Sequence, residues 1–227
     1  MNKSVNILLI LLLIPVFGLT IFVGFDLPVE FLKTSGKNLP FQHIIFIVFG
    51  IIIFLLGARR SMQRWIGVKM VNKEEKYQWN QEIDAKRKAQ INMYLIIEGV
   101  MHILVAFALI LLTQKALVIA TVFFALGLDH ILFCVFGNLK KVWRVGVTNK
   151  AIVIAERDFK VIYFSGLRRI TVHQQTLFFD YIKELQLAIS IDSITPENRA
   201  SFRNVLEEKL NRDKVHFSET FKEFYEI

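Results

Sequence analysis

The sequence predicts a membrane α-helical protein with four transmembrane helices, followed by a small C-terminal α+β domain. Four long apolar runs lie within the first 137 residues, and short runs rich in Val, Ile, Phe and Tyr follow them. The composition agrees, because 54% hydrophobic residues and a mean hydropathy of +0.44 are too high for an ordinary soluble domain. We therefore divide the chain into a transmembrane domain, residues 1–140, and a C-terminal domain, residues 141–227.

The first apolar run, Val5–Phe25, is long enough to be a transmembrane helix, since about 20 residues cross the hydrocarbon layer. A signal peptide is the alternative. However, its apolar core would be shorter than this run, and no small-x-small cleavage site follows before the Asp-Leu-Pro tripeptide at 26–28. A polar loop over Asp26–Pro40, interrupted by Pro and Gly, leads to a second predicted span, Phe41–Gly57.

The longest loop between spans, residues 59–90, is also the most basic. It carries nine Lys or Arg and four acids, so nine minus four gives +5 of the chain's +8. The positive-inside bias therefore places this loop and both termini in the cytoplasm, for a multi-pass protein of the inner (plasma) membrane. Five basic residues near the second span are expected to contact anionic lipid headgroups: Arg59, Arg60, Arg64, Lys69 and Lys73.

A helical pattern of apolar residues runs from Met62 to Met70 inside this basic loop. It fits a helix lying in the headgroup plane, and it fits equally a cytoplasmic extension of the second span. The basic charge does not predict nucleic-acid binding, because the sequence has no aromatic RNP signature and no zinc-finger spacing.

Two further apolar runs, Tyr94–Leu112 and Ala116–Gly137, are joined by three polar residues, so we expect an antiparallel transmembrane hairpin. The hairpin contains two acids and two histidines, each expensive in lipid and therefore expected to face protein. Helical spacing puts the first acid and the first histidine on one face. The members of this polar cluster are Glu98, His102, Asp129 and His130.

Three interpretations of the polar cluster remain open. In the favoured one, imidazoles and carboxylates pair and lock the helices together. The second is a zinc or iron site, because two imidazoles and two carboxylates are a plausible ligand set. The third is a proton path through histidines that titrate near neutral pH. No cofactor and no catalytic residue are predicted, since the sequence lacks a phosphate-binding glycine loop, a Gly-x-Ser-x-Gly elbow and a His-Glu-x-x-His pair.

Beyond Asn138 the pattern indicates an antiparallel sheet followed by a helix. Turn residues separate six predicted strands: 142–147, 151–156, 160–164, 169–173, 177–182 and 185–191. Thr195 is the expected N-cap of the helix, with proline at its first position and an apolar face of Phe202, Val205, Leu206 and Leu210.

This arrangement resembles the bacterial pleckstrin-homology-like (PH-like) domains that are attached to membrane spans. The residues carrying the resemblance are Trp143–Lys150, Tyr163–Ile170 and the helix Pro196–Leu210. The resemblance implies a binding or assembly module held near the inner leaflet. Four basic residues of this module are candidates for contacts with phosphates or a partner, and an ordinary solvated face is the alternative: Arg157, Lys160, Arg168 and Arg169.

The C-terminal segment places four aromatic residues on one helical stripe behind a possible N-cap, Ser218. The domain itself, a partner or lipid must cover this stripe of Phe217, Phe221, Phe224 and Tyr225. The sequence thus favours a non-enzymatic membrane protein that binds lipid headgroups and a protein partner or a second copy. The alternative is an intramembrane metal-dependent enzyme or proton-coupled unit built on the polar cluster.

Overall fold

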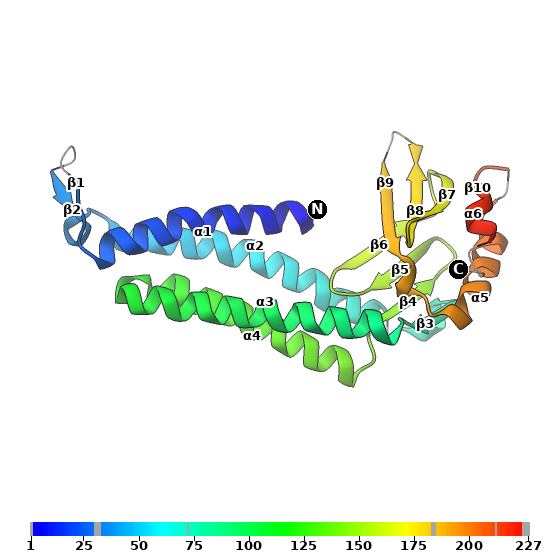
Figure 1. The fold of residues 1–227 in the computed structure, drawn as a ribbon, viewed down its shortest axis with the longest axis horizontal. Coiled ribbons are helices and arrows are strands. Elements are labelled where there is room, and N and C mark those ends of the chain that lie inside the picture. Colours follow the sequence, from blue (N-terminus) through cyan, green and yellow to red (C-terminus); the bar gives the residue numbers. More distant parts are fainter. Residues whose placement is uncertain (1, 30–32, 72, 183–184, 212, 224–227) are drawn as a thin grey trace. The chain divides into compact units, whose positions relative to one another are not determined.

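A computed structural model describes residues 2–29, 33–71, 73–182, 185–211 and 213–223 (Figure 1). The chain forms two compact units, which we describe separately. The helical unit comprises Met1–Gln63 and Tyr94–Cys134, and the sheet unit comprises Arg64–Met93 and Val135–Ile227. This division differs from the predicted boundary at residue 140, because part of the basic loop supplies a strand to the C-terminal sheets.

Four helices confirm the predicted transmembrane part: α1 (Asn2–Gly24), α2 (Gln42–Val71), α3 (Ala85–Leu112) and α4 (Leu117–Leu139). Each contains a stretch long and apolar enough to cross a membrane. The second and third are longer than predicted. The segment from Met62 to Met70 is the last part of α2, so the structure shows an extension of the span and no separate helix there.

Apolar side chains from all four helices form the core of the helical unit, among them Val16, Phe46, Leu109 and Phe123. The buried positions of α2 recur every three or four residues along its whole length, at 46, 50, 53, 57, 60, 64, 67 and 71. Such spacing keeps one stripe of a helix facing its neighbours. The stripe continues past the apolar stretch, where it contains two arginines, Arg60 and Arg64.

The loop between α1 and α2 is ordered by Asp26. It contains β1 (Pro28–Val29) paired antiparallel with β2 (Thr34–Ser35). The backbone N–H of Lys37 donates to Asp26 Oδ1 at 2.7 Å, and the Lys37 ammonium lies 3.7 Å from Oδ2. These interactions stabilise the ionised carboxylate, the backbone hydrogen bond most of all, and hold the pKa of Asp26 below its usual value.

We expect this loop to loosen in acid. Because the pKa of Asp26 is lower when the loop is folded, the stability it contributes is complete above the unfolded pKa of about 3.9 and is lost as pH falls through the folded value. Amide hydrogen exchange at Lys37 should therefore accelerate as pH falls below about 4, relative to its intrinsic rate, and an Asp26→Asn variant should show no such dependence. Equal behaviour of the two proteins would contradict this role.

The sheet unit contains two four-stranded sheets. The first has the order β3-β4-β5-β6, formed by β3 (Trp79–Glu82), β4 (Arg144–Val147), β5 (Ala151–Ala155) and β6 (Phe159–Tyr163). The second has the order β10-β7-β8-β9, formed by β7 (Leu167–His173), β8 (Thr176–Tyr181), β9 (Gln186–Ser190) and β10 (His216–Phe217). All pairs are antiparallel except β10 with β7.

Sequence reasoning missed β3 as well as the two-residue strands β1, β2 and β10. Strand β3 precedes α3, whereas its partner β4 follows α4. The pairing runs from Trp79 opposite Val147 to Glu82 opposite Arg144. The α3–α4 hairpin is therefore inserted into the sheet between two neighbouring strands. Both ends of the hairpin must consequently lie on the same side of any membrane that it crosses.

The predicted C-terminal helix is α5 (Pro196–Lys209), and Phe202, Leu206 and Leu210 are buried as expected. Thr195 occupies the N-cap position, but its hydroxyl makes no capping hydrogen bond and accepts one from the side-chain amide of Asn198 instead. The indole of Trp79 donates to Ser201, and its ring lies 5.1 Å from that of Phe202, which ties α5 to β3.

Candidate functional site

The polar cluster of the helical unit gathers around one carboxylate, that of Glu98 on α3. A guanidinium nitrogen of Arg60, on α2, lies 3.0 Å from Glu98 Oε2, and His130 Nε2, on α4, lies 3.2 Å from the same oxygen. Three helices thus bring an acid and two basic groups together. The arginine and histidine side chains are almost completely buried, so the charges of this group are compensated inside the protein.

The backbone fixes how the two histidines present their rings. His102 Nδ1 lies 2.6 Å from the carbonyl oxygen of Glu98, and His130 Nδ1 lies 2.7 Å from that of Leu126. Since a carbonyl oxygen only accepts, Nδ1 carries the proton in both rings. His130 Nε2 and the Glu98 carboxylate would then be two acceptors facing each other, so this pair is suited to hold a proton between them. The histidine rings stack with their centroids 5.1 Å apart.

The fourth predicted member, Asp129, makes a different contact. Its Oδ1 accepts a hydrogen bond of 2.8 Å from the hydroxyl of Ser61 on α2. Across the described parts of the chain, no group of three or more His, Cys, Asp or Glu is placed to hold a metal ion. The predicted set of candidate ligands is therefore not assembled as a metal centre, because Glu98 is engaged by Arg60 and Asp129 by Ser61.

The five basic residues predicted to contact lipid headgroups separate into two kinds. Arg59, Lys69 and Lys73 are exposed. Arg60 and Arg64 are buried, with only 6% and 2% of each residue exposed, and this part of the prediction is wrong. The cause is the length of α2, whose buried stripe continues through both arginines. Sequence reasoning thus missed Arg60 and Ser61 as members of the polar cluster.

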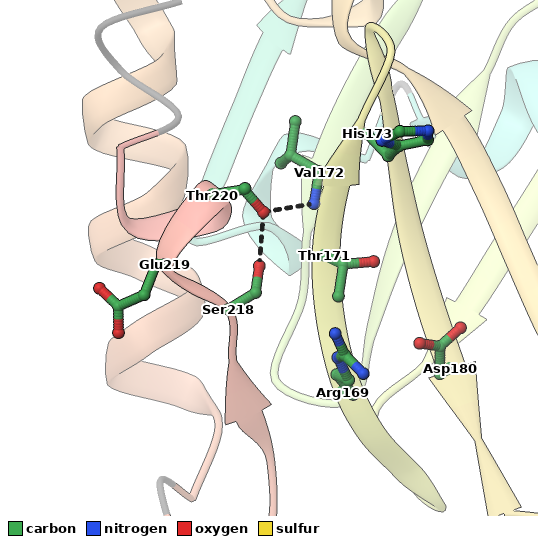
Figure 2. A pocket seen from close by; sticks show the side chains of 8 residues that line it. All are labelled: Arg169, Thr171, Val172, His173, Asp180, Ser218, Glu219 and Thr220. Atoms are coloured by element: carbon green, nitrogen blue, oxygen red, sulfur yellow. Dashed lines mark hydrogen bonds between the residues drawn. The ribbon is translucent and has the colours of Figure 1, made fainter.

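The four basic candidates of the C-terminal domain come from three segments, and Arg157 lies in the bend between β5 and β6. Lys160 lies on β6, whereas Arg168 and Arg169 lie on β7 in the other sheet. Arg169 lines an open pocket of about 410 Å³ between β7, β8 and the segment after β10, shown in Figure 2. Asp180 and Glu219 also line this pocket, so its mixed charge does not favour a phosphate.

The aromatic tail packs partly inside its own domain, but the predicted helical stripe is wrong at Phe217, which lies on β10, whereas Phe221 lies in the short helix α6 (Glu219–Lys222). Phe217 and Phe221 are buried, and their rings stack with centroids 5.4 Å apart. Ser218 caps α6 by accepting from the N–H of Phe221, as predicted, while Thr220 accepts from the N–H of Val172 on β7 (Figure 2). Phe224 and Tyr225 lie outside the described residues.

A second pocket, of about 280 Å³, lies in the sheet unit between the end of α2 and the sheet β3-β4-β5-β6. Its apolar lining includes Ile66, Met70, Val153, Val161 and Tyr163. Four lysines also line it: Lys69, Lys73, Lys76 and Lys150. We call it the lysine pocket. Sequence reasoning identified two of these lysines, and it missed Lys76 and Lys150, which only the folded sheet brings beside them.

Comparison with protein-family models, with curated proteins and with solved structures found no match to this chain.

Proposed function

We propose that this chain is a non-enzymatic integral protein of the inner membrane, whose PH-like sheet unit acts as a cytoplasmic binding and assembly module at the inner leaflet. The observation that carries the proposal is the pairing of β3 with β4 around the α3–α4 hairpin. The chain consequently passes between the helical unit and the sheet unit at three points, after Gln63, Met93 and Cys134. A module attached in this way stays beside the lipid surface.

The order of the strands supports the PH-like assignment. With β3 included, seven antiparallel strands divide as β3-β4-β5-β6 and β7-β8-β9, and α5 follows them. The charge distribution supports a cytoplasmic location. The loop between α1 and α2 contains two lysines, whereas the segments on the other side of the spans hold most of the Lys and Arg residues.

The polar cluster supports a structural role in the anchor. The charge of Glu98 is balanced by Arg60 and His130, which come from the two neighbouring helices α2 and α4. Gly99 and Gly127 let α3 and α4 approach closely, since a Cβ at either position would lie 3.0 Å or less from the other's carbonyl oxygen. Together these contacts fix the register of the helices.

Cysteine labelling in intact cells tests the topology. In a Cys134→Ser background, Lys37→Cys and Lys214→Cys place one thiol at an exposed position of the α1–α2 loop or of the sheet unit. A membrane-impermeant maleimide should label only Lys37→Cys in cells with a permeabilised outer membrane, and both variants after lysis. Labelling of Lys214→Cys before lysis would contradict a cytoplasmic sheet unit.

Photo-crosslinking tests the assembly role in the full-length protein. A photoreactive residue replacing Arg168, Ile182 or Lys214 lies at an exposed position of the sheet unit. At least one of these positions should give a discrete adduct with a protein, either a second copy or another chain. The same residue at Leu111, 86% exposed near the end of α3, should give lipid adducts only. Protein adducts at none of the three positions would contradict the assembly role.

One observation favours a second function, a proton-coupled unit. The close approach of His130 Nε2 to Glu98, at 3.2 Å, lies beside a second, stacked histidine, His102. Purified protein in liposomes with an internal pH dye distinguishes the two functions, since a structural cluster gives no proton flux. A flux that disappears in His130→Gln would favour the second function.

Metal analysis of the purified protein tests the remaining alternative, a metal-dependent enzyme. Zinc or iron bound in stoichiometric amounts and lost in His102→Ala would favour it.

A further inference from the structure

We infer that the lysine pocket binds one anionic glycerophospholipid, whose phosphate lies among the four lysines and whose glycerol and upper acyl chains lie on the apolar lining. This inference rests on the proposed function and names a lipid as the ligand of the sheet unit. The pocket combines four cationic side chains with a lining that is otherwise mainly aliphatic and aromatic.

The charges at the pocket have one sign. No described acid lines it, and among the described residues none of its lysines forms an ion pair within 4.0 Å. Glu75 is exposed in the 3-10 turn Glu74–Lys76 but is not one of the lining residues. The four lysines therefore give the pocket a positive field, and an anion is the complementary ligand.

The walls of the pocket are preorganised. Tyr77 packs its ring on Gly146, where a Cβ would overlap it, and donates from its hydroxyl to the carbonyl oxygen of Met70 at 3.1 Å. Burial raises the pKa of Tyr77, so the phenol stays protonated as this donor at physiological pH. The hydroxyl of Thr148 accepts from the N–H groups of Lys150 and Ala151, which orders the turn that carries the fourth lysine.

The apolar lining is left uncovered by the described chain. Ile66, Met70 and Tyr163 are 50%, 43% and 60% exposed, although all three line the pocket. A free phosphate would satisfy the lysines and leave this apolar surface in water. An amphiphile with a phosphate at one end covers both.

The position of the pocket along α2 selects a membrane lipid as the source of that phosphate. The helix has 30 residues and is therefore about 45 Å long, whereas the hydrocarbon layer is about 30 Å thick. Its last ten or so residues thus extend beyond the hydrocarbon layer, and these include Ile66, Lys69 and Met70. Lipid phosphates lie at this depth.

Lipid titration of the full-length protein in detergent tests the inference. The probes are dioctanoyl-phosphatidylglycerol, dioctanoyl-phosphatidylcholine and inorganic phosphate, with bound lipid counted by native mass spectrometry. Wild type should retain one phosphatidylglycerol more strongly than phosphatidylcholine, and phosphate should not displace it at equal concentration. The double variant Lys73→Gln/Lys150→Gln should lower the affinity for phosphatidylglycerol about 25-fold, because each lysine should contribute a factor of about five.

The matched control is Lys214→Gln/Lys222→Gln, which removes the same charge from exposed positions of the same unit that do not line the pocket. It should change the affinity less than twofold. Equal losses in the two double variants, no preference for the anionic lipid, or displacement by phosphate alone would each overturn the inference. If phosphatidylglycerol selectivity is absent while the cysteine labels and protein adducts are as expected, the inference fails and the proposed function stands.

Discussion

Replacing Glu98 by glutamine is expected to destabilise the helical unit by about 3 kcal/mol. The variant keeps the shape of the side chain but removes the carboxylate that lies 3.0 Å from Arg60 and 3.2 Å from His130. The buried Arg60 then loses an ionised carboxylate partner in a region that water does not reach easily. Unfolding by sodium dodecyl sulfate in mixed micelles, followed by circular dichroism, measures the loss.

An exposed ion pair supplies the control for Glu98→Gln. Glu82 Oε1 lies 3.6 Å from Lys141 Nζ, with both side chains substantially exposed, so Glu82→Gln should cost less than about 1 kcal/mol. The double variant Arg60→Gln/Glu98→Gln should recover part of the stability lost in Glu98→Gln, because no uncompensated charge remains. A double variant whose loss equals the sum of the single losses would show that the two groups do not interact.

Gly67→Val is expected to destabilise the sheet unit by about 2 to 3 kcal/mol. A Cβ at Gly67 would lie 2.5 Å from the ring of Phe159 on β6, so the larger side chain forces the end of α2 away from the sheet. Val71 and Val153, which share a small core beside this contact, would be partly exposed. Thermal unfolding followed by tryptophan fluorescence measures the effect, since Trp65, Trp79 and Trp143 all belong to the sheet unit.

Gly18→Val in α1 is the matched control, because nothing lies within 4 Å of a Cβ at Gly18. It introduces the same β-branched side chain into another helix and should leave the fluorescence transition of the sheet unit unchanged. A second variant, Gly67→Val/Phe159→Ala, should unfold closer to wild type than Gly67→Val does. If Phe159→Ala brings no recovery, the contact between α2 and β6 is not the cause.

Most of the secondary structure could be predicted from the sequence, because its signals are local. The apolar runs define the four helices, and the turn residues separate the strands from β4 to β9 with errors of one or two residues. The strand β3 could not be predicted in this way. Its four residues, Trp-Asn-Gln-Glu, have no alternating pattern, and they form a strand only because β4 pairs with them after the hairpin.

The candidate sites depended on contacts between distant segments. The sequence indicated that Glu98 and His130 belong to one polar cluster, and the structure brings Glu98 Oε2 and His130 Nε2 to 3.2 Å. It did not indicate Arg60, because the predicted span ended at Gly57, before the buried stripe of α2 reached the arginine. Extending the buried stripe of α2 in steps of three and four residues past Gly57 would have identified Arg60.

The insertion of a helical hairpin between β3 and β4 also constrains biosynthesis. As the ribosome releases the chain, β3 emerges first and has no neighbouring strand until α3, α4 and β4 have been made. The first sheet can therefore close only after the whole hairpin and β4 have been synthesised. Until then β3 is a strand without its neighbour, and a chain that stalls within the hairpin would expose it to degradation.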